Sequence, residues 1–305
     1  MASPIRGVLV PTARIDRAVG VVIAFAAAYS WMSVGHAYGD PGAGADFLDG
    51  STHAIVLGPT FMPDPTTFPG YVPGAVTEYL EPLGFSDSGT VTALITPESP
   101  DFGPSIASGV DTLVHTIEAA YNANEISAAD PLTVFGYSQS AVIASLAEQE
   151  LAAYQIPLQD LRFVMLGDAA ADPLSGPTGL LDTWGATPFG QEVDYFLGWS
   201  NLVDVTTPNH LYPTDVFTVV NDFFGDTATP ADFAADPLGA LWQDFVGFFE
   251  HGVYLGGLPE SEILTAIDGG GVVDGATTYF TLADPANLFL SIWDVTLGSF
   301  GIAVP

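Results

Sequence analysis

Short apolar runs alternate with segments of helical periodicity along most of the chain, and this alternation restricts the possible fold more than any other feature. The apolar runs have the length of buried strands and cover residues 53–58, 91–96, 132–136, 161–167, 215–221 and 277–283. Helical periodicity covers residues 71–82, 105–122, 140–154 and 236–250. Strands that alternate with helices form a parallel sheet covered on both faces. The sequence therefore predicts an α/β fold with a mostly parallel central sheet.

The alternation is interrupted over residues 168–214. This segment contains five prolines and two tryptophans and has no clear strand or helix pattern. Long segments of this kind in a compact domain are usually functional. We interpret it as a lid-like insertion over the edge of the sheet that contributes to the wall of a pocket.

The N-terminal region has the features of an export signal. Three of the four arginines lie before residue 18, and residues 18–34 are uncharged and apolar. We predict that residues 1–37 are an export signal cleaved after Ala37; the alternative is an uncleaved N-terminal anchor, since the stretch is just long enough for a bilayer. Either way the bulk of the chain is expected outside the cytoplasm, secreted or associated with the cell envelope or membrane. Residues 38–52 are predicted to be a linker, and residues 53–305 the folded domain.

The charge of the chain excludes several classes of function. There are 36 acidic and 4 basic residues, and the formal net charge is −32. Such a chain cannot neutralise phosphates, which argues against nucleic acid as a partner and disfavours electrostatic docking on anionic lipid. Cysteine is absent, so disulfides, thiolate nucleophiles and cysteine metal sites are excluded. The acidic segment 222–237 lacks the spacing of a calcium loop, and we expect neither a metal nor a cofactor.

A candidate nucleophile lies in the sequence GYSQS, residues 136–140. The run follows a predicted strand and opens a predicted helix, which is the context of a nucleophile elbow. The sharp turn places Ser138 in an unfavourable backbone conformation and requires small neighbours two residues away. Gly136 and Ser140 meet this requirement, although Ser140 replaces the usual second glycine. The alternative is a turn of small residues without a catalytic role.

A catalytic serine needs a base and an acid. In α/β-hydrolases the order along the chain is serine, acid, histidine, and His251 is the histidine with a suitable acid before it; His210 is the weaker alternative. We expect His36, His53 and His115 to have no role in catalysis. The acid should follow a strand, and strand 215–221 leads directly to Asp222, with Asp226 four residues later. We favour Asp222 and keep Asp226 as the alternate acid.

Two N–H donors are expected to bind the oxyanion of the tetrahedral intermediate. One is the backbone N–H of Gln139, the residue after the nucleophile. The other should come from the loop after the first strand, LGPTFMPDP, where Pro59 has no N–H. The second donor is therefore Thr60 or Phe61, and Thr60 would add its hydroxyl group.

These residues together resemble the PE-PPE domain, a family of serine α/β-hydrolases of actinobacterial envelopes that is similar to cutinases. The family's Gly-x-Ser-x-Gly/Ser elbow matches residues 136–140. Its Tyr-Asp-Gly-x-Ala-Asp-Phe-Pro motif matches at Asp222 and Asp226, whereas Asn221 replaces the tyrosine and the Phe-Pro is missing. Its Val-His-x-x-Tyr motif matches at His251 and Tyr254, with glutamate in place of the valine. The resemblance covers roughly residues 53–290.

The resemblance implies an esterase that acts on acyl esters through an acyl-enzyme on Ser138. In some relatives it implies acyl transfer between envelope glycolipids, in which a sugar hydroxyl replaces water as the attacking group. A second hypothesis is a protein with a hydrolase-like fold that binds lipid or a partner without catalysis. A third is a structural acidic protein, which does not explain the order of serine, acid and histidine at strand ends.

Overall fold

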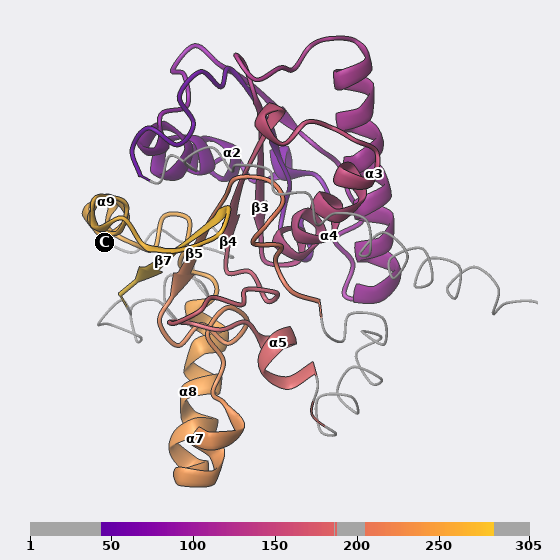
Figure 1. Cartoon of the computed structure of the whole chain (residues 1–305). Coiled ribbons are helices and arrows are strands. Elements are labelled where there is room, and N and C mark those ends of the chain that lie inside the picture. The colour runs from indigo at the N-terminus through magenta and orange to yellow at the C-terminus, as the bar shows by residue number, and fades with distance from the viewer. Residues whose placement is uncertain (1–43, 186, 188–204, 284–305) are drawn as a thin grey trace, which may run out of the picture. The chain divides into compact units, whose positions relative to one another are not determined.

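The computed structural model describes residues 44–185, 187 and 205–283 (Figure 1). The chain divides into two compact units, Met1–Gly39 and Asp40–Pro305, and all the described residues belong to the second. The predicted export signal, residues 1–37, and a large part of the predicted insertion lie outside the described residues. Within the described part of the chain, no helix is both long and apolar enough to cross a bilayer.

Seven strands form a single sheet with the order β2-β1-β3-β4-β5-β7-β6. Their bounds are β1 His53–Val56, β2 Thr90–Ala93, β3 Leu132–Tyr137, β4 Leu161–Leu166, β5 Thr214–Val219, β6 Val272–Asp274 and β7 Thr277–Leu282. All neighbouring strands are parallel except β6, which pairs antiparallel with β7. The prediction of a mostly parallel sheet is confirmed.

Helices cover both faces of the sheet. The first helix, α2 Tyr71–Gly74, continues as the π-helical η2 Ala75–Leu80 and the short η3 Glu81–Leu83. The other helices are α3 Phe102–Asn122, α4 Gln139–Ala153, α5 Leu180–Gly185, α7 Pro230–Ala235, α8 Pro237–Glu250 and α9 Glu260–Gly269. Two single 3₁₀ turns are η1 Pro65–Thr67 and η4 Leu158–Asp160. One face packs against α3 and α4, and the other against the α2–η2 segment and α9 (Figure 1).

The side chains of the central strands alternate between two apolar cores. In β4, Phe163 and Met165 lie in the core under α3 and α4, whereas Val164 and Leu166 lie in the core on the other face. Strands buried on both faces need an apolar residue at most positions, and β3 to β5 are accordingly rich in apolar side chains, although β5 also buries polar residues such as Asp215. Since the strands are parallel, their carboxyl ends lie at one edge of the sheet, where α/β folds bind their ligands.

The structure differs from the sequence prediction in several segments. Residues 44–52 are not a free linker: Phe47 and Leu48 are buried in the core beside η2 and α9, so the predicted linker is wrong over this range. The antiparallel edge strand β6 and the helices α5, α7 and α9 were not predicted. All four elements are ten residues long or shorter, and such short segments carry a weak periodic signal.

Candidate active site

Ser138 lies in a sharp turn between β3 and α4. Its backbone has φ 61° and ψ −121°, a strained conformation for a residue other than glycine. A Cβ atom at Gly136 would lie 2.6 Å from the carbonyl oxygen of Ser140, so a larger residue there would separate the strand from the helix. The Oγ of Ser140 accepts the N–H of Tyr137 at 2.9 Å. A serine at position 140 is therefore accommodated in the elbow, because its hydroxyl group bonds to the turn.

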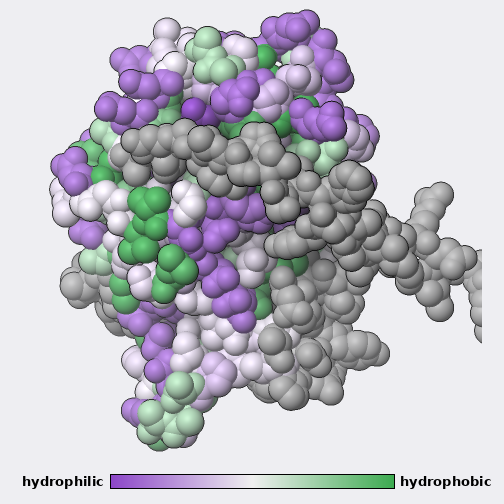
Figure 2. Space-filling model, viewed as in Figure 1, coloured by the Kyte–Doolittle hydropathy of each residue, from purple (hydrophilic) through white to green (hydrophobic). Residues whose placement is uncertain are grey.

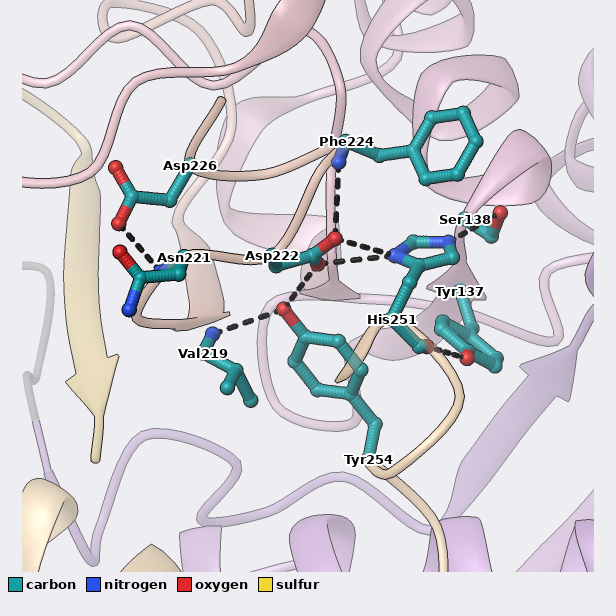
Figure 3. Close-up of polar contacts among 9 residues, drawn as sticks. All are labelled: Tyr137, Ser138, Val219, Asn221, Asp222, Phe224, Asp226, His251 and Tyr254. Atoms are coloured by element: carbon teal, nitrogen blue, oxygen red, sulfur yellow. Dashed lines mark hydrogen bonds and ion pairs between the residues drawn. The ribbon is translucent and has the colours of Figure 1, made fainter. Parts of the chain in front are cut away.

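His251 and Asp222 lie next to Ser138 in a continuous line of polar contacts (Figure 3). The Nε2 atom of His251 is 2.7 Å from the Oγ of Ser138. The Nδ1 atom of His251 is 2.9 Å from both carboxylate oxygens of Asp222. Ser138 follows β3, Asp222 follows β5 and His251 follows α8, and all three lie at the carboxyl edge of the sheet. This is the arrangement of a nucleophile, a general base and an acid that orients the base.

Asp222 is fully buried and is held by further donors. Its Oδ1 accepts the N–H of Phe224 at 2.9 Å, and its Oδ2 accepts the hydroxyl group of Tyr254 at 2.6 Å. The Tyr254 hydroxyl group in turn accepts the N–H of Val219 at 2.9 Å. These donors satisfy the oxygen atoms of a carboxylate that water does not reach. Tyr254 belongs to the motif that contains His251, and its hydrogen bond to Asp222 gives it a physical role there.

Asp226, the alternate acid, does not contact His251. Its Oδ2 accepts the N–H of Asn221 at 2.8 Å and so closes the turn after β5 (Figure 3). Asn221 has φ 66°, in the left-handed region that asparagine tolerates better than most residues. Burial raises the pKa of Asp226. The structure thus places Asp222 against the histidine and Asp226 in the turn that supports Asp222.

The other described histidines lie away from Ser138. His53 begins β1, at the opposite edge of the sheet from the elbow. The Nδ1 of His115 lies 2.6 Å from the carbonyl oxygen of Asp111, one turn earlier in α3. His210 is exposed and lies beside Asn209. His36 lies outside the described residues. Of the described histidines, His251 is the one that contacts both the serine and the carboxylate of this site.

Gly167 and Tyr137 also shape the site, and the sequence did not identify them. Gly167 has φ 53°, and a Cβ atom there would lie 2.8 Å from Cε1 of His251 and 2.9 Å from Oδ2 of Asp222. A side chain at this position would displace the histidine or the acid. The hydroxyl group of Tyr137 donates to the backbone carbonyl of His251 and fixes the end of α8. Both roles depend on contacts between segments far apart in the chain, although a glycine directly after a buried strand is a weak signal of close approach.

The candidate oxyanion site involves Gln139 and Thr60. The Thr60 hydroxyl group donates to Oε1 of Gln139 at 3.0 Å, and Nε2 of Gln139 donates to the Oγ of Ser105 at 2.6 Å. These bonds connect the loop after β1 with the start of α4 and with α3. The N–H of Phe61 donates to the carbonyl oxygen of Glu98 at 2.7 Å. That N–H is engaged, so Thr60 is the better candidate of the two for the second donor. The candidate group is its backbone N–H, because the hydroxyl group that was expected to assist donates its hydrogen to Gln139.

A pocket opens beside the Ser138 side chain. It has a volume of roughly 350 Å³, including the space that is open to solvent, and it is lined by Phe102, Ile106, Ser138, Gln139, Val142, Gly167, Ala169, Leu181 and Phe224. Most of this lining is aliphatic or aromatic. Apolar walls with a few polar groups at one end are typical of sites that bind small apolar ligands. An acyl chain that enters here would have its carbonyl end at Ser138.

Glu98 is a buried acid next to the candidate oxyanion loop. Its Oε1 accepts the hydroxyl group of Thr96 at 2.7 Å, and its backbone carbonyl holds Phe61. Burial raises the pKa of Glu98 from 4.5 to about 7. Between these two values the unfolded chain releases a proton that the folded chain retains. Glu98 therefore makes the folded state less stable as the pH rises from about 4.5 to 7.

We expect the substitution Glu98→Gln to weaken the pH dependence of stability. The free energy of unfolding of the wild type should fall between pH 5 and pH 8, and the variant should lose roughly 2 kcal/mol less over this range. Urea denaturation at both pH values measures this difference. An equal fall in the variant would mean that Glu98 does not titrate in this range. Asp87→Asn, at an exposed loop carboxylate, is the control.

The sequence model of the PE-PPE domain family matches residues 85–284, the larger part of the chain. The chain belongs to the PE-PPE domain family. A relative is the uncharacterized PPE family protein PPE28 of Mycobacterium tuberculosis, which is 31% identical over 159 residues. The match covers 52% of this chain and 21% of PPE28, so this PE-PPE chain corresponds to only a part of that longer relative.

Two solved structures are similar to this PE-PPE domain at low identity. A cutinase-like protein from Cryptococcus sp. is 16% identical with a TM-score of 0.39, and the match covers 70% of this chain and all of that one. Lysin B from Mycobacteriophage D29 is 19% identical with a TM-score of 0.30, covering 42% of this chain and 50% of that chain. A fold is shared by proteins of many functions. The α/β-hydrolase class of this domain rests on its own sheet order and on the elbow after β3.

Proposed function

We propose that this protein is an exported serine hydrolase that cleaves acyl esters through an acyl-enzyme on Ser138. The observation that carries the proposal is the line of contacts from Ser138 through His251 to Asp222, with separations of 2.7 and 2.9 Å. A serine in a strained elbow, paired with a histidine that a buried carboxylate orients, is the arrangement of an activated nucleophile.

The reaction follows from these positions. Ser138 Oγ attacks the carbonyl carbon of the ester while Nε2 of His251 takes its proton, and Asp222 stabilises the imidazolium that forms. The oxyanion lies near the N–H of Gln139 and Thr60. His251 then protonates the leaving alcohol, and the carbonyl forms again as the acyl-enzyme. Water attacks this ester with His251 as the base, and the carboxylic acid leaves as Ser138 regains its proton.

The pocket supports an acyl ester as the substrate. Its apolar walls would bind an acyl chain, whereas a charged or sugar-like group would lose hydration there without a partner. The same acyl-enzyme would also transfer its acyl group if a sugar hydroxyl replaced water in the second step. The proposal of export rests on residues 1–37, where arginines precede an uncharged apolar stretch.

We expect turnover of p-nitrophenyl esters to depend on chain length, and Ala169→Leu to shift the optimum to shorter chains. Ala169 lines the pocket, and the three additional carbon atoms of leucine would occupy part of it. The measurement is kcat/KM for esters of increasing acyl length. Ala119→Leu, on the exposed side of α3, is the control and should keep the wild-type optimum. An unchanged optimum in a folded Ala169→Leu variant would show that the acyl chain binds elsewhere.

A further inference from the structure

Helix α8 carries large apolar side chains on a surface that faces solvent. We define the α8 apolar face as the five residues with side chains 53–79% exposed, which are Leu238, Leu241, Trp242, Phe245 and Phe248. Their spacing of three and four residues places them along one side of the helix. In Figure 1, α7 and α8 extend away from the sheet. A continuous apolar stripe of this size on a protein surface usually marks an interaction site.

This face is connected to the active site by neighbouring rings. The ring centroids are 5.7 Å apart for Trp242 and Phe245, 5.4 Å for Phe245 and Phe249, 5.7 Å for Phe249 and Phe248, 6.3 Å for Phe248 and Phe224, and 4.4 Å for Phe224 and His251. Phe224 also lines the pocket beside Ser138. The rings therefore connect the α8 apolar face with the pocket beside Ser138, and no polar residue lies between Trp242 and Phe224 in this series.

The charges around the helix restrict what can bind there. Residues 205–283 contain no lysine or arginine, so nothing nearby would attract an anionic headgroup. The two acids of α8 do not belong to the face: Asp244 accepts the N–H of Ala228, and Glu250 is buried. In Figure 2, hydrophilic residues lie over the upper end and the middle of the visible surface, whereas the projecting helices at its lower end are mostly pale in this view. A suitable occupant is apolar and carries no net negative charge.

We propose that the α8 apolar face docks on the surface of aggregated, uncharged acyl lipid and so places the pocket mouth at that surface. The inference rests on the proposed function, because an esterase for water-insoluble acyl lipids must reach a substrate that is held in an aggregate. Tryptophan, phenylalanine and leucine on one side of a helix insert into the boundary of a lipid layer. The rings from Trp242 to Phe224 then provide an apolar path from the lipid surface to Ser138.

The test measures binding to lipid separately from catalysis. The protein is the chain from Asp40, since all described core residues lie in that unit. It carries Ser138→Ala, so that ester cleavage does not alter the lipid. Sedimentation with phosphatidylcholine vesicles that contain diacylglycerol gives the partition coefficient. The double variant Trp242→Gln/Phe245→Gln should lower this coefficient roughly tenfold. The control Tyr154→Gln/Val273→Gln, at exposed apolar residues outside the face, should leave it unchanged.

Hydrolytic activity, measured in proteins that keep the native Ser138, provides the second measurement. The double variant should hydrolyse water-soluble p-nitrophenyl acetate at nearly the wild-type rate but lose roughly tenfold in the hydrolysis of diacylglycerol in vesicles. Absence of activity on both esters in the wild type would contradict the proposed function. Equal vesicle binding by the Ser138→Ala protein with and without the double substitution would contradict the docking surface. The docking proposal would also be wrong if the wild type formed dimers that the double variant does not form. It would likewise be wrong if vesicle binding required removal of residues 284–305.

Discussion

The variant Ser138→Ala should lose at least about a thousandfold in kcat for ester hydrolysis while it still folds. In the proposed mechanism the serine Oγ forms the acyl-enzyme. The groups of a serine–histidine–acid site act as a unit, so removal of one group removes most of their joint effect. The substitution should create no packing defect, because the Ser138 side chain borders a pocket that is open to solvent. Hydrolysis of p-nitrophenyl butyrate and circular dichroism of both proteins measure activity and fold.

Labelling with a fluorophosphonate gives an independent measure of the same nucleophile. The wild type should react and Ser138→Ala should not, since the reagent needs an activated serine. Ser108→Ala, at an exposed position of α3, is the control and should retain both labelling and activity. If Ser138→Ala kept most of its activity, the acyl-enzyme could not form at the elbow. A wild type that neither reacts nor hydrolyses esters would favour the binding hypothesis.

The variant Asp222→Asn should lower kcat by about three to four orders of magnitude, whereas Asp226→Asn should lower it only severalfold. An amide at position 222 presents an NH₂ group to donors that now bond to a carboxylate, and it cannot hold the ring of His251 in the orientation that accepts a proton from serine. An amide at position 226 keeps an oxygen that can accept the N–H of Asn221. The two carboxylates are four residues apart, so the pair of variants separates catalysis from support of the turn.

The histidines provide a parallel comparison. His251→Ala should reduce kcat to a similar degree as Asp222→Asn, and His210→Ala should leave it near the wild-type value, because His210 is exposed and lies away from Ser138. Steady-state kinetics on one soluble ester is sufficient for all four variants. A large loss in Asp226→Asn with none in Asp222→Asn would reverse the assignment of the acid. A large loss in His210→Ala alone would do the same for the base.

The features that the sequence predicts well are those with local causes. The elbow is an example, because its steric requirement lies within Gly136, Ser138 and Ser140. The sheet is another, since strands buried on both faces are apolar at most positions and are recognisable without their partners. Parallel strands end at one edge, so residues that follow β3 and β5 were expected to lie near each other. The edge strand β6 and the short helix α5 lacked such a signal and were missed.

The choice between neighbouring candidates was decided by tertiary structure. Asp222 and Asp226 both follow β5, and what separates them is the left-handed Asn221 together with the close approach of α8. A Cβ atom at Gly247 would lie 1.9 Å from the carbonyl oxygen of Asn221. Similarly, the backbone carbonyl of Glu98 engages the N–H of Phe61, which leaves Thr60 as the candidate donor. These contacts join segments that are distant in the chain, so no local pattern encodes them.

The sequence by itself determined the class of sheet, the turn at Ser138 and the order of candidate residues along the chain. Tertiary structure alone decided that Tyr254 and Phe224 hold the buried Asp222, that Gly167 leaves room for His251, and that the α8 apolar face lies next to the pocket. The physical reason is the same in each case. Periodicity and steric limits act over a few residues, whereas hydrogen-bond partners and close packing depend on segments that meet only after the chain has folded.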